Sequence, residues 1–121
     1  MIPAVFVALG AIPGALCRFY LQSALNQGAA LPWGTLTSNL FGCFLAGVVL
    51  WCGADWPQLT KSFVMAGVLG ALTTFSSFVT EVATMFIKNQ YPAAFLYFSL
   101  TVTLTVFACG VGWFMSQKLF A

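Results

Sequence analysis

Four long runs of apolar residues alternate with short polar stretches along the chain. The runs cover residues 3–25, 33–53, 62–87 and 92–116. A helix that crosses a bilayer needs roughly 20 residues, so each run is long enough to span a membrane. A membrane barrel would instead show alternating polarity in segments of about ten residues. We therefore predict an all-α, polytopic membrane protein. It has one membrane domain over residues 1–121, four transmembrane helices and both termini on one side.

The third apolar run has an irregular centre. Residues 67–81 read GVLGALTTFSSFVTE, with two glycines, a Thr-Thr pair and a Ser-Ser pair. Glycine weakens a helix, and Ser and Thr side chains compete with regular backbone hydrogen bonding. Lipid cannot satisfy free backbone groups, so such a break must be buried in protein or line a wet cavity. We expect helix 3 to be broken near residues 70–76, at mid-membrane.

Composition excludes several classes of protein. The hydrophobic fraction is 61% and the charged fraction 5%, whereas a soluble domain has about 25% charged residues. So few charges cannot cover a soluble globule, and a nucleic-acid-binding protein needs a basic face. The chain has no histidine, which argues against a transition-metal site. One Asp, one Glu and no His do not readily supply the paired acid and base of an enzyme.

The four cations divide evenly between the two predicted sides of the membrane. Lys61 and Lys118 fall on the side of the termini, and Arg18, at the end of the first helix, and Lys88 fall on the other. Orientation normally follows the Lys/Arg bias of short loops, and here there is none. Either another feature orients the chain, or copies insert both ways and pair as an antiparallel dimer. The charge count leaves both explanations open.

Polar side chains recur at helical spacing in three of the four runs. These rows contain many O–H and N–H donors but one acid and no base, a composition that suits an anion exchanging its hydration for protein hydrogen bonds. Alternatively, the hydroxyls bond to carbonyls of their own helices and serve packing. The rows are Thr35 and Asn39, then Thr73, Ser77, Thr80, Glu81 and Thr84, and finally Tyr97, Thr101 and Thr105.

Two aromatic and two charged residues have open roles. Phe75 and Phe78 are three residues apart and share a helix face; their positive ring edges could contact an anion, or they could be ordinary core. Arg18 could anchor at the interface or supply positive potential to a vestibule. Glu81 could pair with another group, lie in a wet cavity or be protonated.

Three segments, taken together and in this order, resemble the Fluc/CrcB family of fluoride channels. They are residues 14–18 (GALCR), 34–42 (GTLTSNLFG) and 70–78 (GALTTFSSF). The resemblance extends over essentially the whole chain, and the second and third motifs form a specific combination. It implies a dual-topology, antiparallel homodimer in the bacterial inner membrane, through which fluoride leaves the cell passively by two pores.

The resemblance also implies site residues. The third helix would be broken at the membrane centre, where a structural Na⁺ lies on the dimer axis, held by the backbone carbonyls of Gly70 and Thr73. Arg18 matches a vestibule arginine and Glu81 a glutamate beyond the break. The family commonly has Ser in the helix 4 track, where this chain has Thr, and Thr at the position of Ser77. The implied fluoride pore comprises Phe75, Phe78, Asn39, Thr35, Ser77, Thr80, Tyr97, Thr101 and Thr105.

A second hypothesis is a dual-topology, proton-coupled exporter similar to the small multidrug resistance proteins. Those exporters rely on a glutamate in their first helix, whereas here the first run has no acid and Glu81 lies in the third. The channel therefore remains the main prediction. Its partners would be the fluoride ion, the lipid bilayer and a second copy of the chain, with no nucleic acid.

Overall fold

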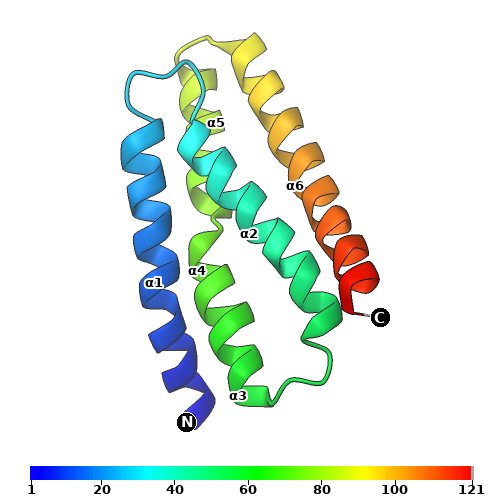
Figure 1. The fold of residues 1–121 in the computed structure, drawn as a ribbon. Coiled ribbons are helices and arrows are strands. Elements are labelled where there is room, and N and C mark those ends of the chain that lie inside the picture. The colour runs from blue at the N-terminus through cyan, green and yellow to red at the C-terminus, as the bar shows by residue number, and fades with distance from the viewer. Residues whose placement is uncertain (121) are drawn as a thin grey trace.

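The computed structural model describes residues 1–120, and within them it is all-helical, with no strand. The segments long and apolar enough to cross a membrane in this part of the chain are Ile2–Leu25, Trp33–Cys52, Gln58–Ile87 and Tyr91–Leu119. Figure 1 shows them side by side as a bundle. The start of α1 (Ile2–Leu25) and the end of α6 (Tyr91–Phe120) point toward the same end.

The third span is built from four pieces rather than one regular helix. The short α3 (Gln58–Lys61) leads into the π-helix η1 (Ser62–Leu69), followed by α4 (Gly70–Leu72) and α5 (Phe75–Ile87). Thr73 and Thr74 between α4 and α5 have extended backbone, with φ/ψ of −80°/154° and −148°/121°. The span thus begins four residues before the predicted residue 62, and its helix is interrupted within the glycine- and hydroxyl-rich stretch.

Close backbone contacts at glycines hold the spans together in pairs. A Cβ on Gly47 of α2 (Trp33–Cys52) would collide with the carbonyl oxygen of Cys109 in α6, and one on Gly112 with that of Phe44. Small residues at such interfaces allow membrane helices to approach closely, which increases van der Waals packing. The α2–α6 pair is therefore locked by reciprocal glycine contacts.

Close contacts at glycines also join the first and third spans. A Cβ on Gly10 of α1 would collide with the carbonyl oxygen of Phe63, and one on Gly14 with that of Val68. Both carbonyls belong to η1, which is separated from the interruption by the short α4. The first span is thereby held against the segment that positions Thr73 and Thr74.

Candidate functional site

The interruption at Thr73 and Thr74 is stabilised by side chains from two other spans. In an unbroken α-helix, the carbonyl of Gly70 would accept from the Thr74 N–H. Here that N–H donates to Asn39 Oδ1 at 2.7 Å, and Asn39 Nδ2 donates back to the Thr74 carbonyl at 3.0 Å. Arg18 Nη1 donates to the Thr73 carbonyl at 3.2 Å. Side chains of α1 and α2 thus satisfy the backbone groups that the extended residues leave free.

Arg18 therefore lies deeper in the bundle than the end of the first helix, where the charge pattern placed it. Helix α1 continues to Leu25, and the guanidinium reaches a carbonyl of the third span. The carbonyl of Thr73 attracts it because the N–H that would pair with it in a helix, that of Ser77, donates to Thr74 Oγ1 at 3.2 Å.

A cluster of polar side chains surrounds Glu81, and each of the four spans contributes to it. Thr35 Oγ1 donates to Glu81 Oε1 at 2.6 Å, and the Tyr97 hydroxyl donates to Oε2 at 2.7 Å. Asn26 Nδ2 lies 3.3 Å from both Glu81 Oε1 and Thr35 Oγ1, and Gln22 Nε2 donates to Thr35 Oγ1 at 3.0 Å. Neutral donors thus hold the carboxylate in one position.

Gln22 and Asn26 were not predicted as site residues. A signal for them exists in the sequence: Arg18, Gln22 and Asn26 are spaced by four residues and form one polar stripe on an otherwise apolar helix. Asn26 also accepts from the Gly34 N–H at 2.7 Å, which ties the end of α1 to the start of α2.

The two phenylalanines after the interruption lie together but in different surroundings. Their ring centroids are 6.0 Å apart. Phe78 is 3% exposed and packs edge-on against Tyr97, with 5.5 Å between centroids, and against Phe98. Phe75 is 77% exposed. One ring is thus fixed in the bundle, and the other projects from it.

A cavity of about 270 Å³ lies beside these rings, and Thr101 is one of the residues that line it. Thr101 is 4% exposed, and its Oγ1 is the buried side-chain polar atom without a hydrogen-bond partner among the described residues. Leaving such a group unpaired costs roughly 1–3 kcal/mol, so this hydroxyl is an exception among the buried polar groups of the bundle. The cavity is lined by Asn39, Cys43, Thr73, Thr74, Phe75, Phe78, Thr101, Val102, Thr105 and Val106.

Other predicted hydroxyls are occupied within their own helices. Thr80 donates to the Ser76 carbonyl at 2.9 Å and Thr105 to the Thr101 carbonyl at 2.6 Å. A hydroxyl has one proton, so in these rotamers neither presents a donor to a ligand. Ser77 differs, because its Oγ accepts from Thr74 Oγ1 at 3.1 Å and its own proton stays available.

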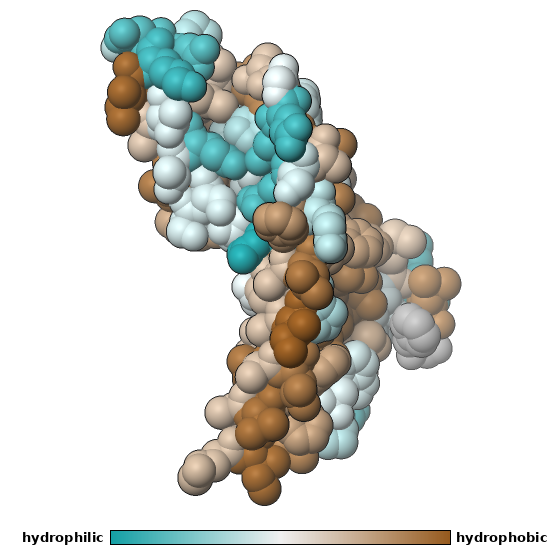
Figure 2. All heavy atoms as spheres, turned by 90° about the vertical axis from the view of Figure 1, so that its left-hand side faces the viewer, coloured by the Kyte–Doolittle hydropathy of each residue, from teal (hydrophilic) through white to brown (hydrophobic). Residues whose placement is uncertain are grey.

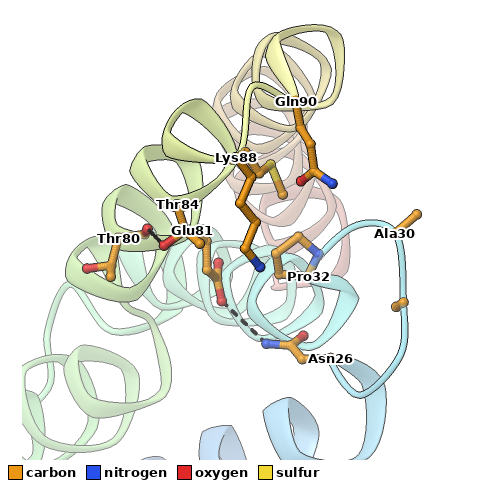
Figure 3. Close-up of a pocket in the computed structure, with 10 residues that line it drawn as sticks. Asn26, Ala30, Pro32, Thr80, Glu81, Thr84, Lys88 and Gln90 are labelled. Atoms are coloured by element: carbon orange, nitrogen blue, oxygen red, sulfur yellow. Dashed lines mark hydrogen bonds between the residues drawn. The ribbon is translucent and has the colours of Figure 1, made fainter.

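Two open cavities flank the Glu81 cluster at the end of the bundle opposite the termini. They share Asn26, Thr80 and Glu81 as a common wall. One, of about 390 Å³, extends past Gln22, Ser76 and Ser77; the other, of about 310 Å³, extends toward Lys88 (Figure 3). Figure 2 shows polar side chains gathered around a hollow on this part of the surface and apolar ones below it.

No group of three or more His, Cys, Asp or Glu residues that could hold a metal ion occurs within residues 1–120. A hard cation such as Na⁺ would need other oxygens, and backbone carbonyls are suitable ligands. The interruption frees suitable groups, since the carbonyls of Gly70 and Thr73 both lose their helical donors there. Both carbonyls therefore fit Na⁺ in donor type, but the Thr73 carbonyl also accepts from the Arg18 guanidinium, whose positive charge opposes a cation beside it.

Comparison with known proteins places this arrangement in a family. The family described as CrcB-like protein, Camphor Resistance (CrcB), matches residues 5–113. A fluoride-specific ion channel FluC from Hahella chejuensis is 38% identical over 114 residues, covering 89% of each chain. The FluC of Albidiferax ferrireducens is 41% identical over 113 residues, covering 86% of this chain and 87% of the relative. The match includes all four membrane-spanning segments almost completely, and the chain belongs to the CrcB family of multi-pass membrane proteins.

Proposed function

We propose that this chain is a fluoride-selective ion channel of the bacterial cell membrane, not an enzyme, and that fluoride crosses it passively. Relatives at 38–41% identity over most of the chain bear the name fluoride-specific ion channel. The observation that carries the proposal within this molecule is the buried, unpaired hydroxyl of Thr101, a residue that lines the cavity beside Phe78.

Fluoride binds its hydration water tightly, so a path for it must replace that water with hydrogen-bond donors. Thr101 Oγ1 and Ser77 Oγ each have a proton that is not used in the bundle. Phe78, which follows Ser77 directly in the chain and lines the same cavity as Thr101, has a ring edge that carries partial positive charge. The path that we propose runs along these donors and the Phe75 and Phe78 edges, with Asn39, Thr35 and Tyr97 holding its walls.

The complete pore would need a second copy of the chain. Phe75 is 77% exposed, and the cavity lined by Gln22, Ser76 and Ser77 opens outward from one chain. Lipid cannot satisfy polar groups at membrane depth, so we propose that this face meets water and a partner chain. The even charge distribution favours an antiparallel partner, which gives two pores. Such a dimer would bring four carbonyls, from Gly70 and Thr73 of each copy, to a structural Na⁺ at mid-membrane.

The test is anion efflux from liposomes that contain the purified protein. We expect rapid fluoride efflux and hardly any chloride efflux, with no requirement for a proton gradient. Phe78→Ile and Phe75→Ile should each suppress fluoride efflux while the protein keeps its oligomeric state in detergent. Efflux that requires a proton gradient would instead support the exporter hypothesis, and unchanged efflux in both variants would remove the rings from the path.

A further inference from the structure

Lys88 is exposed and, unlike the other three Lys and Arg side chains, has no polar or aromatic partner within residues 1–120. Arg18 and Lys61 each donate to a backbone carbonyl, at 3.2 and 2.6 Å, and the Lys118 ammonium lies 4.8 Å above an aromatic ring. Among residues 1–120, no side-chain hydrogen bond of Lys88 is found, and the hydrogen bonds to Glu81 come from neutral groups. The Lys88 ammonium is therefore available to a ligand.

The fold directs this ammonium into a cavity. Lys88 is the residue directly after α5, seven residues beyond Glu81, and both residues line the same cavity. This cavity has a volume of about 310 Å³. Figure 3 shows the Lys88 side chain extending into it, toward the level of Glu81 and Asn26.

A rigid turn adds a second polar group to the same wall. Asn89 has a left-handed backbone with φ of 58°, and its Oδ1 accepts from the Tyr91 hydroxyl at 2.8 Å. The Gln90 N–H donates to the Met85 carbonyl at 2.9 Å. Gln90 thereby joins Lys88 on the cavity wall, and Figure 3 shows both side chains descending from this turn. The Gln90 carboxamide has two N–H donors, and they lie on the same cavity wall as the Lys88 ammonium.

We propose that Lys88 and Gln90 form an outer anion-binding station, which captures a small hydrated monovalent anion before it reaches the Glu81 cluster. The inference rests on the proposed channel function and adds the place where the anion enters. Without Lys88, the charged group lining this cavity would be the Glu81 carboxylate, which repels anions. The station binds its ligand through an ammonium and an amide in an open cavity, so it takes chloride as well as fluoride. Selectivity arises further inside.

Binding can be measured without conduction because the chain has three lysines, Lys61, Lys88 and Lys118. Reductive methylation with ¹³C-formaldehyde labels each lysine, and also the N-terminal amine, without removing the positive charge, and Lys→Gln variants assign the three lysine signals in the NMR spectrum. Titration with sodium fluoride, and separately with sodium chloride, should shift the Lys88 signal saturably. The other two signals should drift slightly and linearly with ionic strength. If all three signals shift equally and without saturation, Lys88 and Gln90 do not form an anion-binding station.

Flux measurements provide the second arm. Lys88→Gln should slow fluoride efflux about two- to fivefold in about 10 mM salt, where the Debye length is about 30 Å, and the difference should vanish near 1 M, where it is about 3 Å. Lys88→Arg should match the unmodified protein, as should the control Lys118→Gln. An equal loss at both salt concentrations would contradict capture by charge. If the unmodified protein conducts no fluoride, the channel proposal fails, while the NMR titration still tests the station.

Discussion

Asn39 and Thr74 are joined by two reciprocal hydrogen bonds, one at 2.7 Å from the Thr74 N–H and one at 3.0 Å to the Thr74 carbonyl. The carboxamide thus pairs with a peptide group as another peptide group would. Both residues are buried, at 7% exposure each. The pair therefore fixes the extended backbone between α4 and α5 and ties it to α2.

Replacing Asn39 by Ala should destabilise the protein. The substitution leaves a buried N–H and a buried carbonyl of Thr74 unpaired, at a cost of roughly 1–3 kcal/mol for each group. The expected result is a clearly lower midpoint in thermal unfolding in detergent. Thr37→Ala, at an exposed position of the same helix, is the matched control and should leave the midpoint almost unchanged. Equal midpoints for the two variants would show that the Asn39–Thr74 pair does not stabilise the interruption.

Gly47→Ala should weaken the contact between α2 and α6. Its new methyl group would meet the Cys109 carbonyl, and overpacking of this kind costs about 1–3 kcal/mol. Gly110→Ala is the control, since nothing lies within 4 Å of its added Cβ. Alanine also favours a helix over glycine by up to about 1 kcal/mol, so the control should be neutral or slightly stabilising. Thermal unfolding of both variants checks this, and a destabilised control would mean that the close contact is not the cause.

Tyr97→Phe should reduce fluoride efflux while preserving the fold. It removes the hydroxyl that donates to Glu81 Oε2 at 2.7 Å but keeps the ring that packs against Phe78. Without this donor, one carboxylate oxygen loses its fixed position, and we expect efflux to fall at least severalfold. Tyr20→Phe, at an exposed position of α1, is the control and should conduct normally. Normal efflux from Tyr97→Phe would show that the hydrogen bond between Tyr97 and Glu81 is not needed for conduction.

Thr101→Val should separate stability from conduction. The Thr101 hydroxyl is buried and unpaired, so replacing it with a methyl group should keep or raise the unfolding midpoint. If the hydroxyl serves fluoride, efflux should fall strongly. Thr105→Val removes a hydroxyl that already donates to a carbonyl of its own helix, and it should affect efflux much less. Equal losses in the two variants would argue that the unpaired proton has no special part in conduction.

The positions of the four spans could be predicted from the sequence, and so could the low helix propensity at the centre of the third span. Length and apolarity delimit a spanning helix almost by themselves, so the predicted runs and the observed helices differ by only a few residues at most ends. Local composition likewise marked residues 67–81 as poor helix. The π-helical segment Ser62–Leu69, which overlaps the start of this stretch, was not predicted, because its apolar sequence is equally compatible with a regular helix.

The roles of individual hydroxyls could not be predicted in this way. Thr80, Thr101 and Thr105 look equivalent in the sequence, yet two of them bond to their own helices and one is left unpaired. Which outcome occurs depends on the rotamer and on the facing helix, and helical spacing contains neither. Arg18 is similar, because its partner at Thr73 is 55 residues away.

The sequence by itself thus determined a four-span membrane protein with few charges, a weak third helix and rows of neutral donors. Hydrophobicity and backbone propensity are local properties, and they can be read residue by residue. Only the tertiary structure decided that side chains of all four spans converge on Glu81. It also decided that Asn39 and Arg18 form hydrogen bonds with the free backbone groups of Thr73 and Thr74. It also left Lys88 facing a cavity, with no side-chain hydrogen bond to any residue of the described range 1–120. These features depend on which donor meets which acceptor across helices, and that is set by packing in three dimensions.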